Sequence, residues 1–210
     1  MMRIAIFVDA ANMFYAQREN RWHIDYKRLL EYFLKDKEFS GAYYFTGTPF
    51  YQEPQKVKGY RNFKKLLIYA GYTVIDKEVK VIKGNELVWK ILINEKTIEE
   101  TVKEKKIDKD KIKLYNVEIE LIKEFKDKRK ANLDIEMVLK MVTTMNNYDC
   151  AILLGGDSDF VPIIEYLQNC GKKIICVGRR QSTALEIINI SNEFIDLNDI
   201  KSNIVKRGSL

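Results

Sequence analysis

Ala151-Ile-Leu-Leu-Gly-Gly-Asp-Ser-Asp-Phe160 is an apolar run that stops at two glycines and continues into two aspartates with one residue between them. A short apolar run bounded by glycine is typical of a buried strand in a parallel sheet. Asp157 and Asp159 are therefore predicted to lie at the carboxyl end of that strand. Open α/β sheets bind their ligands at this edge.

The beginning of the chain has the same design. Ile4-Ala-Ile-Phe-Val8 leads directly into Asp9 and then Asn12. Because the carboxyl ends of parallel strands meet at one edge of a sheet, the acids that follow the two strands are expected to face one crevice.

Strands and helices alternate through most of the chain, which predicts an α/β fold with a mainly parallel sheet. Strands are expected at 4–8, 41–46, 72–75, 150–154, 173–177 and 194–197. Helices are expected at 11–18, 54–70, 159–169 and 184–190, after Asp25, and from Asp134 onward. Asp25 and Ser182 are predicted N-caps, and Gly71 is suited to a left-handed helix end.

The alternation fails between residues 77 and 130. Two β-type runs, 79–82 and 87–93, flank Lys83-Gly-Asn-Glu86, which predicts a hairpin, and a charged, helix-prone stretch follows. This segment holds 16 Lys or Arg and 12 Asp or Glu, a surplus of +4 out of the net charge of +6 of the chain. Its basic end, 126–130, fits a solvated surface and a phosphate-contacting patch equally well. We predict one domain, 1–210, with an insertion at 77–130.

Composition excludes several classes of function. The single histidine, His23, argues against a Ser-His-Asp mechanism. The three cysteines, Cys150, Cys170 and Cys176, lack a paired C-x-x-C spacing, so we expect buried thiols rather than disulfides or a zinc site. No segment reaches membrane length, so a cytoplasmic location is expected. The basic charge favours a polyanionic partner, and association of identical copies stays open.

Four acids occupy positions that such a sheet would bring together: Asp9, Asp134, Asp157 and Asp159. Two carboxylates about 4 Å apart repel by about 4 kcal/mol at an effective dielectric near 20, a cost that a divalent cation removes. Oxygen ligands without His or Cys favour Mg²⁺ or Mn²⁺ over Zn²⁺. Asp134 and Asp159 could be ordinary acids at helix starts, Asp157 could be a turn residue, and Asn12 could cap the first helix. The residues alone leave a nuclease, a phosphatase and an inert sheet open.

Five motifs resemble those of NYN domains of the LabA-like group, which are relatives of PIN-domain nucleases. They are Phe7-Val-Asp-Ala-Ala-Asn-Met13, Lys130-Ala-Asn-Leu-Asp134, Leu154-Gly-Gly-Asp-Ser-Asp-Phe-Val-Pro-Ile163, Gly171-Lys-Lys-Ile-Ile-Cys-Val-Gly178 and Phe194-Ile-Asp-Leu197. Their order and spacing fit the group over nearly all of the chain outside the insertion.

This resemblance implies a PIN-like, Rossmann-like three-layer α/β/α fold. The β-hairpin and helical insertion at 77–130 is longer than is expected for the group, and the resemblance assigns it no role. The resemblance also implies a metal-dependent endoribonuclease that uses Mg²⁺ or Mn²⁺. By position, it assigns the metal and catalytic roles to Asp9, Asp134, Asp157 and Asp159, assisted by Asn12. The sequence departs from the group at Lys140, where another Asp is common, and at Ala131-Asn132, where a glycine is usual. Glu136 is the candidate substitute for the missing acid. It is two residues from Asp134, however, so it lies on a different face of the helix.

The basic residues expected to contact single-stranded or loop RNA are Arg61, Lys64, Lys130, Arg179 and Arg180. For the two residues on the 54–70 helix, an ordinary solvated face is the alternative. Two other functions stay open, a non-catalytic RNA-binding or regulatory module and, with less support, a phosphatase or nucleotidase.

Overall fold

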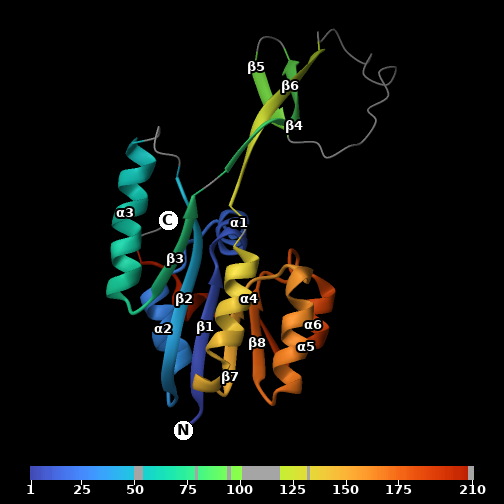
Figure 1. Ribbon diagram of the computed structural model, residues 1–210. Coiled ribbons are helices and arrows are strands. Elements are labelled where there is room, and N and C mark those ends of the chain that lie inside the picture. The colour runs from blue at the N-terminus through green and yellow to red at the C-terminus, as the bar shows by residue number, and fades with distance from the viewer. Residues whose placement is uncertain (50–53, 79, 94–95, 101–118, 132, 208–210) are drawn as a thin grey trace. The chain divides into compact units, whose positions relative to one another are not determined.

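The computed structural model describes residues 1–49, 54–78, 80–93, 96–100, 119–131 and 133–207 (Figure 1). It contains two compact units, one formed by 1–79 and 131–210 and the other by 80–130. Each is described by itself, the second through its backbone.

The first unit is built on a six-stranded sheet with the order β3-β2-β1-β7-β8-β9, in which every neighbouring pair is parallel. The strands are β1 (Arg3–Asp9), β2 (Glu38–Thr48), β3 (Thr73–Glu78), β7 (Cys150–Leu154), β8 (Lys173–Gly178) and β9 (Glu193–Asp196). The helices are α1 (Ala10–Asn20), α2 (Tyr26–Leu34), α3 (Pro54–Tyr69), α4 (Asp134–Thr143), α5 (Val161–Asn169), α6 (Leu185–Ile190) and α7 (Lys201–Ile204).

Helices cover both faces of the sheet and bury two separate cores. Alternate residues of β1 point to opposite faces, as the period of a strand requires. Ile4, Ile6 and Val8 pack with apolar residues of α1 and α2. Ala5 and Phe7 pack with α4, α5 and α6, of which α4 and α5 lie on the near face in Figure 1. The predicted three-layer α/β/α fold is confirmed.

The order in which the chain adds strands to the sheet reverses between β1 and β7. From β1 the chain crosses to β2 on one side, whereas β7 lies on the other side and leads to β8. Crevices for ligands form at such a switch point, outside the carboxyl ends of the strands. Val8 pairs with Leu154, so Asp9 and Gly155 follow at the same level.

Local signals placed most elements of this unit correctly. The bounds of β7 are those expected, Asp25 caps α2 by accepting from the amides of Lys27 and Arg28, and Gly71 has a positive φ of 104°. Ser182 is not an N-cap, because α6 begins after Ala184 and the Ser182 hydroxyl instead donates to the Arg179 carbonyl. Cys170 is exposed rather than buried, because it follows α5 at the surface.

The second unit is an antiparallel sheet of three described strands, β4 (Lys80–Ile93), β5 (Lys96–Glu100) and β6 (Ile119–Lys130), in the order β5-β4-β6. The hairpin predicted around residues 83–86 is wrong, because β4 runs through them and only its register with β6 shifts there. The helix predicted for the charged stretch is wrong over 119–130, where the backbone pairs with β4. Such long-range pairing overrides local helix propensity. Residues 101–118 lie outside the described part.

Candidate functional site

Asp9 is the last residue of β1 and the N-cap of α1. Its Oδ1 accepts hydrogen bonds from the amides of Ala11 (2.9 Å) and Asn12 (3.2 Å), and its Oδ2 accepts one from the Asn12 side-chain amide (3.1 Å). These bonds fix the carboxylate at the positive end of a helix. Asn12 therefore holds Asp9 with its side chain, and Asp9, not Asn12, caps the helix.

Asp9 is half-buried, and its electrostatic setting is unusual. Burial raises the pKa of Asp9, hydrogen bonds from Asn12 and Ala11 oppose that rise, and the charge of Asp157 adds to it. Gly155 borders the side chain, since a Cβ on Gly155 would lie 3.7 Å from the Asp9 Cβ. The ends of β1 and β7 thus bring two acids into electrostatic contact.

Asp157 and Asp159 follow β7 in an exposed turn. Asp157 caps the short helix η3 (Ser158–Phe160), and its Oδ1 accepts from the Asp159 amide at 3.1 Å. Phe160 anchors this turn, because its ring is fully buried in the core beneath α4 and α5. The turn therefore has a fixed base and presents both carboxylates to solvent.

Asp134 begins α4, and α4 contacts both β1 and η3. A helix that leads into a strand of a parallel sheet starts at the carboxyl edge, so all four predicted acids lie along that edge (Figure 1). Within the described ranges, however, no three His, Cys, Asp or Glu side chains converge closely enough to hold a metal ion.

Glu136 and Lys140 contact residues of β3 and β2 rather than the four acids. Glu136 Oε1 accepts from Lys77 Nζ of β3 at 2.6 Å, and hydrogen bonding to Lys77 lowers the pKa of Glu136. Lys140 Nζ lies 5.3 Å from the centre of the Tyr43 ring, on the middle of β2. At the position where the group often has an acid, this chain therefore has a lysine whose ammonium lies over an aromatic ring.

Two glycines and a threonine support the loop that follows β8. Thr183 is buried, and its hydroxyl donates to the Arg179 carbonyl at 2.9 Å. A Cβ on Gly156 or Gly178 would lie 2.8 or 2.5 Å from Thr183 Oγ1, so the close approach requires glycine at both positions. The Ala184 amide donates to the Gly156 carbonyl at 2.9 Å, which fixes the residue before Asp157. Sequence reasoning missed this contact because Thr183 belongs to no recognised motif.

The predicted RNA-contacting residues differ in how free their charges are. Arg179 pairs with Glu19 at 2.9 Å and donates to Asn20 at 3.2 Å, so it ties the β8 loop to α1. Arg180 is exposed, with its guanidinium 5.1 Å from the centre of the Phe194 ring. Arg61 is exposed on α3, and the side chain of Lys130 lies outside the described part.

Lys64 has a structural partner. Its ammonium lies 2.6 Å from Asp76 Oδ2, which also accepts from the Tyr60 hydroxyl. Burial alone would raise the pKa of Asp76, but the hydrogen bonds from Lys64 and Tyr60 outweigh burial and lower it. Lys64 therefore joins α3 to β3, and its charge is largely compensated.

Replacing Lys64 by Gln is expected to lower the free energy of unfolding by about 1 kcal/mol at pH 7. A carboxyl group whose pKa is lowered by folding stabilises above its unfolded pKa, and this stability is lost as the pH falls through the folded pKa. The difference from wild type should therefore shrink in acid. Urea unfolding at pH 7 and at pH about 3 measures it, with Lys65→Gln on the exposed side of α3 as control. Equal effects of both substitutions would contradict the structural role.

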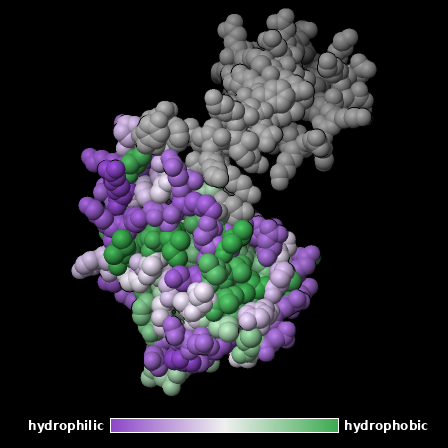
Figure 2. Space-filling model, viewed as in Figure 1, coloured by the Kyte–Doolittle hydropathy of each residue, from purple (hydrophilic) through white to green (hydrophobic). Residues whose placement is uncertain are grey.

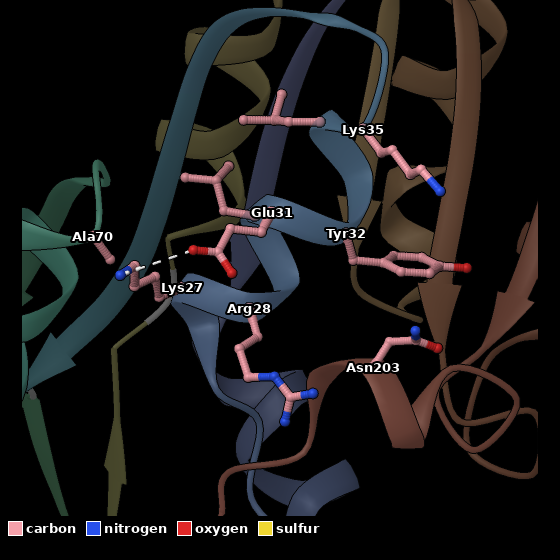
Figure 3. Close-up of a pocket in the computed structure, with 9 residues that line it drawn as sticks. Lys27, Arg28, Glu31, Tyr32, Lys35, Ala70 and Asn203 are labelled. Carbon is pink, nitrogen blue, oxygen red and sulfur yellow. Dashed lines mark ion pairs between the residues drawn. The ribbon is translucent and has the colours of Figure 1, made fainter.

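The shallow pocket in Figure 3 lies away from the acids. It has a volume of about 700 Å³ and is lined by residues of α2, Ala70 and Asn203. Leu34 and Ala70 lie shortly before β2 and β3, which places the pocket toward the amino edge of the sheet. On its α2 wall, Lys27 and Glu31 form an ion pair at 3.8 Å. It contains none of the predicted site residues.

A doubly wound parallel sheet with carboxylates at its switch point defines a Rossmann-like α/β domain of the PIN-like kind. The NYN domain family matches residues 3–94 and 86–198. The low amplitude and bright protein LabA of Synechococcus elongatus is 33% identical over 213 aligned positions, which cover 97% of this chain and 88% of that protein. This chain therefore belongs to the NYN domain family, in its LabA-like group.

A solved structure of another protein has the same fold as this chain. It is the crystal structure of a protein of unknown function from Vibrio parahaemolyticus, with a TM-score of 0.64 and 20% identity. The match covers 98% of this chain and 96% of that one, and at such low identity it shows the fold alone. In the part of this chain that the structure describes, no helix has the length and apolarity needed to cross a membrane.

Proposed function

We propose that the protein is a metal-dependent endoribonuclease that hydrolyses RNA phosphodiesters at the carboxyl edge between β1 and β7. The observation that carries the proposal is the pair Asp9 and Asp157, in which burial and the second charge raise the pKa of Asp9. Acids whose pKa is shifted by burial and by a neighbouring charge are enriched at functional sites. A cation between the two carboxylates would remove their repulsion.

The donor set suits Mg²⁺ or Mn²⁺ in kind. Asp9 Oδ2 accepts only the Asn12 amide, and Asp157 Oδ1 accepts the Asp159 amide, so each carboxylate retains lone pairs for a hard cation. A bound Mg²⁺ or Mn²⁺ supplies a Lewis acid and lowers the pKa of water. Asp134 and Asp159, which lie at helix starts along the same edge, would complete the donor set or orient the attacking water.

In this proposal the chain's own groups position the substrate. Asp9 is held by the start of α1, and Asp134 and Asp159 orient the attacking water as hydrogen-bond acceptors. Arg180 and Arg61 bind phosphates of single-stranded or loop RNA in the cytoplasm, and Arg179 holds the loop that carries Arg180.

Lys140 favours a second candidate, a non-catalytic RNA-binding or regulatory module. It fixes a cation over Tyr43 where the group often carries an acid. A site with fewer acids binds a divalent cation more weakly, and RNA could then be retained without being cut.

Incubation of labelled RNA with Mn²⁺ or Mg²⁺, using wild type and Asp157→Asn, separates the candidates. We expect cleavage by wild type that EDTA abolishes and that falls at least about 100-fold in the variant, since a metal contributes several kcal/mol to the transition state. Equal cleavage by both proteins indicates contamination and refutes the proposal. Binding without cleavage supports the regulatory module, and release of phosphate from nucleoside monophosphates supports a phosphatase.

A further inference from the structure

Helix α1 exposes its two aromatic side chains and buries two alanines and a methionine. Its buried residues are Ala10, Met13 and Ala16. Phe14 and Tyr15 are 60% and 59% exposed. A helix that only covered a sheet would turn its aromatic residues inward, where burying such a ring is worth several kcal/mol. The distribution on α1 therefore indicates a contact outside the fold.

The two rings are arranged as neighbours on one surface. Their centroids are 5.5 Å apart and their planes make an angle of 77°. Edge-to-face packing of this kind holds each ring in place. Because both side chains remain mostly exposed, ring surface is open to a planar ligand.

The pair adjoins the proposed catalytic edge. Asp9 caps α1, and at 1.5 Å rise per residue Phe14 and Tyr15 lie about 7 to 9 Å along the helix from it. Arg18, one turn beyond Phe14, is exposed and has no carboxylate partner among the described residues. Acid, rings and cation thus follow one another in sequence along a single helix.

We propose that Phe14 and Tyr15 form a stacking platform for bases of single-stranded RNA, with Arg18 binding a phosphate. The inference rests on the proposed function and specifies its substrate as single-stranded near the cleavage site. Aromatic faces beside a cation are the common means of binding single strands without base specificity. Bases in a duplex are already stacked and cannot use such a platform.

Another exposed apolar surface on this unit lacks these properties. Figure 2 shows apolar residues gathered over α4, where Ile135 and Leu139 are 78% and 60% exposed. Aliphatic side chains have no π face on which a base can stack. RNA is therefore assigned to α1 rather than to α4.

Equilibrium binding tests the platform separately from catalysis. The protein carries Asp157→Asn and EDTA is present, so that no cleavage occurs. The probes are a fluorescein-labelled 12-nucleotide RNA, the same RNA with abasic sites, and the corresponding duplex. The variants are Phe14→Leu/Tyr15→Leu, which keeps apolar bulk, and Tyr69→Ala, an exposed aromatic at the end of α3 near the amino edge, as control. Thermal melts verify folding.

We expect the leucine variant to bind the single strand roughly 5- to 150-fold more weakly, as 1–3 kcal/mol per stacked base implies. With the platform intact, the abasic probe should bind more weakly than the RNA with bases, whereas the leucine variant should bind both probes equally. The affinity for the duplex should be the same with and without the leucine change. Equal affinities in the leucine and Tyr69→Ala variants would overturn the platform. The platform would also be overturned if the protein is a dimer and the leucine change dissociates it, since the rings would then contact a second copy of the chain.

The two proposals fail in different ways. If wild type cleaves RNA in an Asp157-dependent manner but binding ignores the rings, the platform is wrong and the nuclease remains. If the rings govern binding but no metal supports cleavage, the platform stands on a non-catalytic RNA-binding protein.

Discussion

Asp9→Asn is expected to abolish RNA cleavage and to raise thermal stability at the same time. Asparagine is as good an N-cap as aspartate, so the contacts with the amides of Ala11 and Asn12 survive. It carries no negative charge, so a divalent cation loses a principal ligand and cleavage should fall at least about 100-fold. Stability should rise by about 1 kcal/mol, or about 2–4 °C in Tm.

The stability gain has a defined pH dependence. Burial and the charge of Asp157 raise the pKa of Asp9, so the ionised carboxylate destabilises the folded state. This penalty is complete above the folded pKa and disappears as the pH falls below the unfolded pKa. Melting curves of wild type and variant from pH 4 to 8 should therefore converge in acid. Lower stability of Asp9→Asn at pH 7 would contradict this view of the site.

Gly178→Ala is expected to destabilise the fold by about 1–3 kcal/mol. The new methyl group would lie 2.5 Å from Thr183 Oγ1, and Thr183 cannot rotate away without breaking its hydrogen bond to the Arg179 carbonyl. Chemical denaturation measures the loss. Because the same loop fixes Gly156, cleavage activity of the folded fraction should also decline.

A double-mutant cycle isolates this contact. Thr183→Ala removes the obstructing hydroxyl, so its cost should be about 1 kcal/mol smaller in the Gly178→Ala background than in wild type. Thr183→Val puts a methyl group in the same place and should give no such relief. Additive effects in both pairs would show that Gly178 is not held close to Thr183.

The sequence predicted the central sheet well because its strands carry their own boundaries. β7 is an apolar run closed by Gly155 and Gly156, and β1 closes on Asp9. Helix starts at Asp25 and Asp134 were also visible locally. These features depend on neighbours in the chain, which is why they can be recognised without a structure.

Features that depend on distant partners were not predictable. The charged residues 119–130 form β6 because β4 pairs with them, although they are helix-prone in isolation. In the sequence Lys64 and Arg179 have no evident partners. In the folded protein Asp76 of β3 lies beside Lys64, and Glu19 of α1 lies beside Arg179. The predicted acids do lie along one edge, but their side-chain distances follow from rotamers that no sequence pattern specifies.

Binding of Mn²⁺, followed by electron paramagnetic resonance in the absence of RNA, tests most directly whether Asp9 and Asp157 form a cation site. We expect wild type to bind Mn²⁺ and each of Asp9→Asn and Asp157→Asn to weaken that binding at least about tenfold. The control is Glu165→Gln, which replaces an exposed acid on α5 and should leave the Mn²⁺ affinity unchanged. Equal Mn²⁺ affinity in all four proteins would contradict a cation site at Asp9 and Asp157.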